Sequence, residues 1–443
     1  MDASAHRLRL RVKVPRALLD PGAQGEQPPL PAGDHEGLLA VELDLAEGRI
    51  ESIQAAAGPH ASGQQWPLAL PPLLEPHAHL DKAFSWSGFA NPEGSMAGAL
   101  AANSREAAAR SADQVLMRGE RALEQGWRYG LRAIRSHIDS GGPQEQPSWE
   151  ALQTLRQRWA GRLELQLVAL VPLTYWSTTA GAALAQRVAA AGGLLGAVLG
   201  PPFSEGYRHA EQLGQLLGLA EQHGCGIDLH IDESDSQPAL GLRLLLRELR
   251  RRPVHVPITC SHACSLSLLT EDEQRRLAGN LAAQGVAVVA LPSTNLWLLG
   301  RRRGLRGPQR PIAPVRVLQQ EGVTTAIGGD NVQDPWYPGG DFDPIELLRL
   351  TLPALQLAPW NRQGLMPFST SAARLLGLPW DGVLRPGAPA DLLVLAASSW
   401  SELLARPPQR RVLRSGRWIE EPQQQQQPDP RLASLNTAAD TSL

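Results

Sequence analysis

The chain has 443 residues, and its 42 Lys and Arg residues stand against 44 Asp and Glu residues, which leaves a formal net charge of −2. Hydrophobic residues make up 43% of the chain. This composition excludes a basic nucleic-acid-binding protein and an acidic disordered one. Because a single core usually stops growing near about 250–300 residues, the length predicts one large core and a smaller second one.

Cysteine and hydropathy patterns indicate the cellular setting. The three cysteines, Cys225, Cys260 and Cys264, have no CxxC spacing, so we expect neither a disulfide framework nor a structural zinc ribbon. Residues 1–20 carry charges every few positions, and no segment reaches the about 20 uninterrupted apolar residues of a membrane span. We therefore expect a soluble cytoplasmic protein that binds neither membranes nor nucleic acid.

Both ends of the chain carry the alternating polar and apolar residues typical of antiparallel strands. The pattern occupies residues 7–14 and 38–53 and returns at 390–395 and 411–419. The two ends are therefore predicted to pair into one small β-sandwich made from residues 1–67 and 381–420. Residues 421–443 include the run Gln423–Gln427, lack periodicity and are expected to be disordered.

Residues 68–380 alternate short apolar runs with helical stretches, which indicates parallel strands joined by crossover helices. The eight expected strands are 68–79, 131–139, 163–171, 194–199, 227–231, 258–262, 287–291 and 325–329. The helices expected between them are 114–125, 149–159, 180–191, 209–223, 239–249, 271–284 and 315–320. Eight such units over about 300 residues predict a (β/α)8 TIM-like barrel. A doubly wound open sheet is the alternative, but no GxGxxG motif follows the first strand.

Ionisable side chains end several of the predicted strands. His77 and His79 end the first strand, where the period of two places both side chains on one face. His230, His262 and Asp330 end the fifth, sixth and eighth strands. Active sites of this fold lie at the carboxyl ends of the strands, so we expect these five residues to meet in one mouth.

Imidazoles and a carboxylate in such a cluster suit one divalent metal ion per chain, Zn²⁺ or Fe²⁺, with a position open for water. Such an ion lowers the pKa of bound water from about 15.7 toward about 7, which supplies hydroxide at neutral pH. Hydrogen-bonded core histidines are the alternative. That alternative weakens as more strand ends carry such groups.

Two further residues lie near the same mouth. Glu233 follows His230 by three residues, where a carboxyl group can carry a proton between water and substrate. The alternative is a solvated acidic loop made of Asp232, Glu233 and Asp235. His137 also ends a strand; it is placed to line the pocket, and nothing in the sequence makes it a metal ligand.

Four segments together resemble the cytosine-deaminase branch of the metal-dependent amidohydrolase superfamily, within a similarity that covers about residues 35–420. They are Glu75–Asp81, His230–Glu233, Cys260–His262 and Gly329–Pro338, of which the last is the most specific. The resemblance implies one metal ion held by His77, His79, His230 and Asp330. It also implies that Glu233 protonates a ring nitrogen, that His262 orients the activated water, and that Trp336 lies beside the substrate.

Two departures from that branch concern the substrate. Cytosine-specific members carry a glutamine after strand 4, where this chain has Pro172 and Leu173, and they tend to have a second aspartate where this chain has Asn331. Losing a bidentate amide weakens selection for cytosine. We therefore expect Trp336, Asn331, Pro172 and Leu173 to border a different substrate. Relatives with two metal ions carry a carboxylated lysine on strand 4, and residues 163–174, taken as that strand, contain no lysine.

These observations predict hydrolytic deamination of an amino-substituted nitrogen heterocycle, which is a small-molecule substrate. The alternatives are hydrolysis of another C–N bond in a cyclic amide or triazine, and a metal-binding barrel without turnover. A homo-oligomer is expected only by analogy with the family. Lys82 follows the HxH motif and is expected at the rim, as a partner of Asp81, a solvated charge or a substrate contact.

Overall fold

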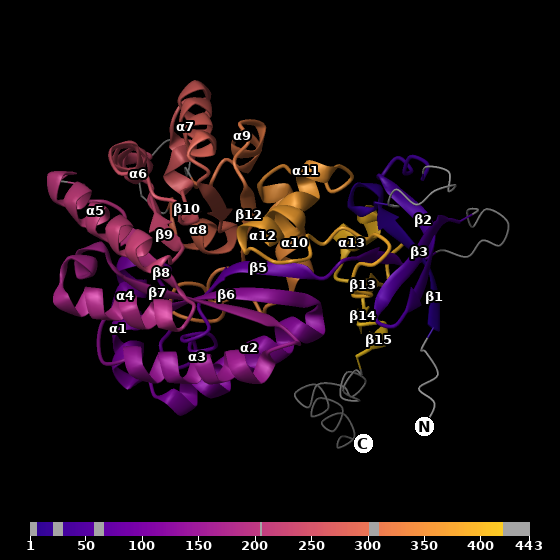
Figure 1. Ribbon diagram of the computed structural model, residues 1–443, viewed down its shortest axis with the longest axis horizontal. Coiled ribbons are helices and arrows are strands. Elements are labelled where there is room, and N and C mark those ends of the chain that lie inside the picture. The colour runs from indigo at the N-terminus through magenta and orange to yellow at the C-terminus, as the bar shows by residue number, and fades with distance from the viewer. Residues whose placement is uncertain (1–6, 21–29, 57–65, 204–205, 301–309, 420–443) are drawn as a thin grey trace, which may run out of the picture.

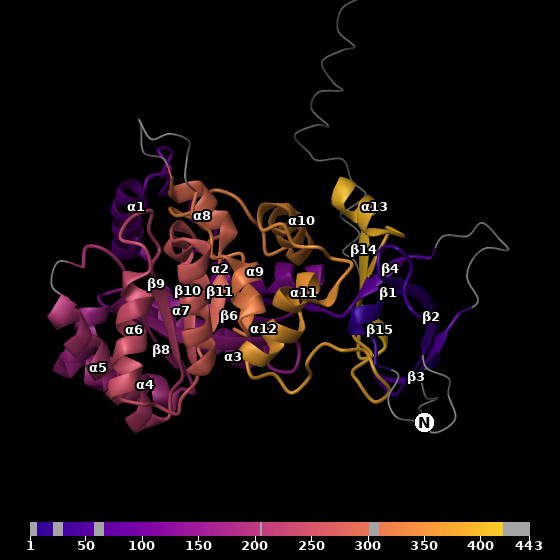
Figure 2. The ribbon, with the colours of Figure 1, turned by 90° about the horizontal axis from the view of Figure 1, so that it is seen from above.

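The computed structural model describes residues 7–20, 30–56, 66–203, 206–300 and 310–419. Within these residues the chain forms an eight-stranded sheet and a seven-stranded sheet. Figures 1 and 2 show them side by side, with the helices gathered around the larger one. The predicted disordered tail, residues 421–443, lies outside the described residues.

The eight-stranded sheet is the predicted barrel, and neighbouring strands in it are parallel. Its last strand returns to its first, because Asp330 forms a parallel bridge with Ala78. The strands are largely buried on both faces, as their place between a core and a helical layer requires. They are β5 (Leu73–Ala78), β6 (Leu131–Asp139), β7 (Glu164–Pro172), β8 (Leu194–Leu199), β9 (Ile227–Ile231), β10 (Ile258–His262), β11 (Ala287–Ala290) and β12 (Thr325–Ile327).

The connecting helices begin and end at recognisable sequence signals. Ser111 and Gln114 form a capping box at the start of α2, and Gly130 ends that helix in a left-handed conformation with φ 101°. The α-helices are α1 (Met96–Ala109), α2 (Ala112–Tyr129), α3 (Glu145–Trp159), α4 (Thr179–Ala190), α5 (Gly206–His223), α6 (Leu240–Arg251), α7 (Glu271–Ala283), α8 (Pro292–Leu298), α9 (Val315–Gln320), α10 (Pro344–Ala354), α11 (Arg362–Leu365), α12 (Thr370–Leu375) and α13 (Trp400–Ala405). The 3-10 helices are η1 (Arg16–Leu18), η3 (Leu173–Ser177), η4 (Cys264–Leu268) and η5 (Met366–Phe368). In the described part of the chain, no helix is both long and apolar enough to cross a lipid bilayer.

Strands from both ends of the chain form the second sheet, as the alternating patterns predicted. Its order is β15-β14-β13-β4-β1-β2-β3. β1 and β2 pair antiparallel from Arg7↔Ala46 to Pro15↔Leu38. The strands are β1 (Arg7–Pro15), β2 (Leu38–Ala46), β3 (Arg49–Ala55), β4 (Leu68–Leu70), β13 (Leu392–Leu395), β14 (Arg410–Arg414) and β15 (Arg417–Trp418).

Two expectations about the barrel strands need correction. The strand predicted at 68–79 is two strands, because Pro71 and Pro72 interrupt it: β4 joins the small sheet and only β5 enters the barrel. The segment 163–174, taken as strand 4, contains the third barrel strand, β7. The fourth strand is β8, which also contains no lysine.

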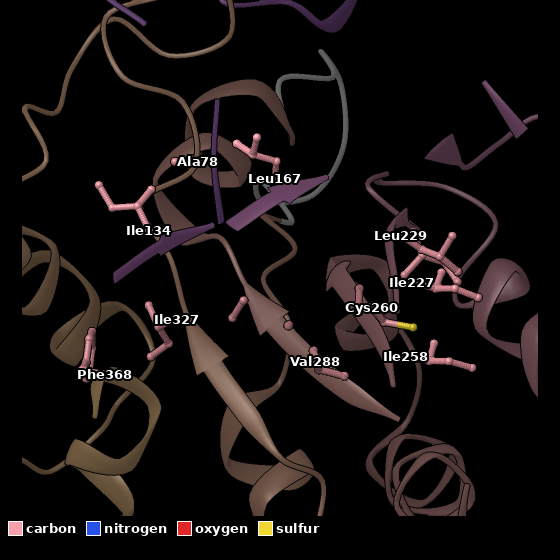
Figure 3. Packing of buried hydrophobic residues seen from close by; sticks show 14 of the residues in the cluster. Ala78, Ile134, Leu167, Ile227, Leu229, Ile258, Cys260, Val288, Ile327 and Phe368 are labelled. Atoms are coloured by element: carbon pink, nitrogen blue, oxygen red, sulfur yellow. The ribbon is translucent and has the colours of Figure 1, made fainter. Parts of the chain in front are cut away.

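One apolar core holds the barrel together. Figure 3 shows buried side chains of several barrel strands, among them Leu167 of β7 and Leu229 of β9, both 0% exposed. The three cysteines are buried and free, and Cys260 belongs to this core, in agreement with a filler role. Packing of this density makes the barrel sensitive to lost volume.

We therefore predict that Leu167→Ala destabilises the protein by about 2–5 kcal/mol, because it leaves a cavity in the core. Leu100→Ala is the matched control, since Leu100 lies on α1 with 57% of its surface exposed, and we expect a change within about 0.5 kcal/mol. Urea unfolding followed by circular dichroism measures both. Equal effects of the two substitutions would contradict this account of the core.

Candidate active site

The ends of four barrel strands bring buried histidines together. His77 lies in β5 and His79 directly after it, His137 lies in β6, His230 in β9, and His262 ends β10. Asp330 follows β12 by three residues. All six side chains are buried, with exposures between 0% and 6%. The structure therefore brings the five predicted strand-end residues into one cluster and adds His137 to it.

Distances within the cluster are short and involve mutually facing ring nitrogens and one carboxylate. Asp330 Oδ1 lies 3.5 Å from His77 Nε2 and 3.3 Å from His79 Nε2. His79 Nε2 lies 3.3 Å from His230 Nε2. Ligand atoms about 2.0–2.1 Å from one tetrahedral metal ion stand about 3.3–3.4 Å apart, so these separations fit a shared cation.

Unsatisfied polar atoms support the same fit. Within the described residues, His77 Nε2, His230 Nδ1, His262 Nε2 and both carboxylate oxygens of Asp330 are buried without a hydrogen-bond partner. Buried polar atoms usually have a partner, so a cluster of orphans indicates a group that completes it. Two sets of three histidines have ligand nitrogens within 4.8 Å of one another: His77, His230 and His262, and His77, His79 and His137. His77 belongs to both sets.

Burial favours the neutral imidazole at His77, His230 and His262, which is the form that binds metal ions. Burial lowers the pKa of His77 and of His230 well below the ordinary value, and neighbouring imidazoles lower both further. Burial lowers the pKa of His262 to about 4. Burial alone would raise the pKa of Asp330, but its close contact with His79 and the charges of His262 and His79 bring it below its ordinary value.

Behind the histidines, a chain of polar groups orients His77. Its Nδ1 lies 2.8 Å from the Ser261 hydroxyl, which donates to Asp228 Oδ1 at 2.7 Å. Arg135 donates to Asp228 Oδ2 at 2.9 Å. This chain fixes the ring of His77, so that its Nε2 points into the cluster. Outer-shell partners of this kind orient metal-binding histidines in other proteins.

A second support comes from Glu75, two residues before His77. Both of its carboxylate oxygens accept hydrogen bonds from the Gly329 amide, at 3.0 and 2.9 Å, and one also accepts from the His77 amide. Burial raises the pKa of Glu75 to about 8, despite these hydrogen bonds. Glu75 thus ties the first strand to the loop that carries Asp330.

Glu233 lies beside His262 on the inner side of the loop after β9. Its Oε1 is 3.5 Å from His262 Nδ1 and 3.5 Å from Asn295 Nδ2, and Asn295 Nδ2 also lies 3.1 Å from His262 Nδ1. Burial, and then the charge of Asp330, raise the pKa of Glu233 well above its ordinary value. A carboxyl group in this setting holds a proton and can donate it.

The alternative of a solvated acidic loop is wrong for this segment. Asp232 is fully buried and accepts hydrogen bonds from the amides of Gly241 and Leu242 at the start of α6. The side chain of Glu233 is only 16% exposed. The loop is therefore anchored, and it holds Glu233 toward the histidines.

The four residues predicted to border the substrate differ in their surroundings. Trp336 is half-buried and packs against an apolar cluster that includes Cys264 and Leu298. The amide of Asn331 donates to Asp334 at 2.7 Å, and Asn331 lines a cavity of about 550 Å³ together with Glu75 and Tyr337. None of the clustered histidines lines that cavity. Pro172 is exposed and Leu173 is buried; a substrate contact for these four residues stays a prediction.

The solvated and Asp81-paired placements considered for Lys82 are wrong. Its side chain is 3% exposed, and its ammonium donates to Asp139 Oδ1 at 2.8 Å. Asp81 pairs instead with Arg110, at 2.7 Å.

Several residues that orient the clustered histidines were not predicted from the sequence. Asp228 stands two residues before His230, so the same period of two that grouped His77 with His79 also marks it. Ser261 and Asn295 carried no such signal, because neither belongs to a recognised metal-binding or acid–base pattern. Helix α1, which places Asn103 near Asp139, was absent from the predicted helices, since its many alanines give it little amphipathic contrast.

A family model and a curated relative each match most of the chain. The model of the Amidohydrolase family matches residues 107–419. A pterin deaminase from Rhizobium rhizogenes is 35% identical over 398 residues, which cover 87% of this chain and 89% of that protein.

Two solved structures share the fold. The 5-methylcytosine deaminase from Klebsiella pneumoniae has a TM-score of 0.76 at 24% identity, covering 95% of this chain and 100% of that one. The N-isopropylammelide isopropylaminohydrolase from Burkholderia multivorans has a TM-score of 0.68 at 26% identity, covering 93% and 98%.

The buried Arg135–Asp228 pair generates a stability prediction. Arg135→Met leaves the Asp228 carboxylate without its guanidinium partner, which costs about 3–5 kcal/mol for a buried pair. Arg105→Met is the control, because Arg105 is exposed on α1 and donates only to the Ala101 carbonyl among the described residues. Thermal and urea unfolding measure the difference. If both variants keep wild-type stability, Arg135 does not support the site in the way described.

Proposed function

The chain belongs to the amidohydrolase family and is a hydrolase that acts on C–N bonds, and from this premise we propose that it deaminates an amino-substituted nitrogen heterocycle. The predicted resemblance to the deaminase-like branch of the superfamily is thereby confirmed. The observation that carries the proposal is the cluster of unpartnered buried imidazoles and Asp330, with the Glu233 carboxyl 3.5 Å from His262.

A pterin is the substrate we propose to test first. The relative that covers 87% of the chain at 35% identity is a pterin deaminase. Pterin is a flat bicyclic 2-amino-4-oxo heterocycle, and it fits the expectation of a substrate other than cytosine, to which Asn331 in place of a second aspartate contributes. Its deamination replaces the C2 amine with an oxo group and releases ammonia.

We propose that one divalent ion, Zn²⁺ or Fe²⁺, is held by His77, His79, His230 and Asp330. Separations of 3.3–3.5 Å among the Nε2 atoms of the three histidines and Asp330 Oδ1 support this set. Among the described residues, His77 Nε2 and both Asp330 oxygens also lack a hydrogen-bond partner. When bound, the ion would supply Lewis acidity that activates water at neutral pH. One ion rather than two fits the chain, because neither β7 nor β8 contains a lysine for a bridging carbamate.

The residues of the chain divide the proton transfers between them. Water adds across the C2=N1 bond of the ring: its oxygen bonds to C2, and Asp330 accepts one of its protons. Glu233 donates its proton to N1. His262 holds the attacking water in place through the ring nitrogen that faces the cluster.

Collapse of the adduct then breaks the C2–N bond. The departing amine takes up the proton that Asp330 accepted, relayed through Glu233, and leaves as ammonia. The second water proton passes to solvent as the C2 oxo group forms, so that atoms and charges balance. Asp330 and Glu233 both return to their starting protonation states when solvent restores the proton given to N1.

Glu233→Gln tests this division of roles. It keeps the shape of the side chain but removes the transferable proton, so kcat for pterin should fall about 10²–10⁴-fold. Glu221→Gln is the control, because Glu221 lies at the surface and contacts His255. Ammonia release from the metal-loaded enzyme, which a chelator should abolish, measures turnover. Unchanged turnover in Glu233→Gln removes Glu233 from its role, and no ammonia from any amino-heterocycle contradicts the proposed function.

A further inference from the structure

Lys82 is a buried cation that the reaction above does not use. It lies in the turn after β5, and its side chain is 3% exposed. The turn is held on both sides: the Leu80 amide donates to Ser136 Oγ at 3.0 Å, and the Asp139 amide donates to Asp81 Oδ2 at 3.0 Å. The backbone that carries Lys82 is therefore fixed against the end of β6.

The charge of Lys82 is only partly used by its neighbours. Its ammonium donates to Asp139 Oδ1 at 2.8 Å, which is its one hydrogen bond in the described part of the chain, whereas an ammonium has three donors. The other oxygen of Asp139 is already paired with Arg110 at 3.1 Å. Arg110 also pairs with Asp81, so Asp139 shares that cation, and Lys82 keeps two donors without an acceptor among the described residues.

The position of Lys82 around the barrel follows from the order of the strands. In the strand order β12-β11-β10-β9-β8-β7-β6-β5, with β12 next to β5, strands β5 and β9 are four steps apart in either direction. Lys82 follows β5 and Glu233 follows β9, so the two lie on opposite sides of the mouth. A flat ring between them presents one edge to Glu233 and the other toward Lys82.

Electrostatic effects agree with this position. Burial lowers the pKa of His230, and the charges of His137, His262, His79 and Lys82 lower it further. Burial raises the pKa of Asp334 to about 6, while a hydrogen bond from Asn331 and the charge of Lys82 oppose that rise. The ammonium therefore acts on both the histidine cluster and the loop after β12.

We propose that Lys82 is a specificity-determining residue whose ammonium donates a hydrogen bond to an oxo group on the ring edge opposite Glu233. This inference rests on the proposed function and names the substrate class within it: 2-amino-4-oxo heterocycles. In pterin, N1 lies on one side of the amine-bearing C2, and the 4-oxo group lies on the other side, beyond N3. With N1 at Glu233, the 4-oxo oxygen faces Lys82.

The test compares two substrates on the full-length, Zn²⁺-loaded enzyme: pterin, and 2-aminopteridine, which lacks the 4-oxo group. Lys82→Met should lower kcat/KM for pterin about 10- to 100-fold, the range for a hydrogen bond to a charged group, and leave 2-aminopteridine nearly unchanged. Lys13→Met is the matched control, since Lys13 is the other lysine of the chain and pairs with Asp34 in the small sheet. It should alter neither substrate.

A parallel loss for both substrates would mean that Lys82 only supports the structure, and it would overturn the inference. So would wild-type enzyme that processes the two compounds equally well. If Lys82→Met fails to fold, Lys82→Gln is the second variant, because it keeps a hydrogen-bond donor for Asp139 but removes the charge. Its decrease in kcat/KM should again be confined to pterin.

A binding measurement separates this inference from the proposed function. Lumazine, the 2,4-dioxo product, keeps the 4-oxo group and binds without turnover, so fluorescence titration gives its Kd. Weaker lumazine binding in Lys82→Met and not in Lys13→Met supports Lys82 as the oxo contact, even if no substrate is deaminated. Equal Kd values in the wild type and both variants overturn it, even if pterin is deaminated.

Discussion

The candidate site depends on a set of buried polar atoms that the rest of the described chain does not satisfy. An unpaired buried donor or acceptor costs about 1–3 kcal/mol, and His77, His230, His262 and Asp330 each contribute at least one. The fold sustains this cost through the apolar barrel core around them. A cation bound by His77 and Asp330 would satisfy the unpaired atoms of those two residues, so metal binding would stabilise the folded protein.

Strain and support are concentrated at the same strand ends. His262 and Asp330 adopt left-handed backbone angles, φ 68° and 67°, that cost residues other than glycine of order 1–3 kcal/mol. Each is held by specific partners: Asn295 contacts the ring of His262, and Glu75 clamps the Gly329 amide next to Asp330. With these partners in place, the left-handed backbone angles direct the two side chains into the cluster. A strand that stayed extended would have carried them past it. The Ser261–Asp228–Arg135 chain does the same for His77.

Much of this arrangement could be predicted from sequence, because periodicity carries directional information. The period of two placed His77 beside His79, and the spacing of β/α units placed His230, His262 and Asp330 at the same mouth. What escaped prediction depends on tertiary geometry. Lys82 is buried because it pairs with Asp139, which is distant in sequence. The apolar run 68–78 is divided into β4 and β5 because its first half pairs with the small sheet and its second half with the barrel. The domain boundaries at 67 and 380 and the substrate contacts of Pro172 and Leu173 stay predictions.

A crystal structure of the metal-loaded protein, with anomalous scattering measured at the zinc or iron edge, tests the central claim most directly. The account predicts one anomalous peak, bonded to ring nitrogens of His77, His79 and His230 and to a carboxylate oxygen of Asp330. A peak held by other residues, or an occupied protein in which Asp330 or His230 points away from the β5 histidines, would contradict it.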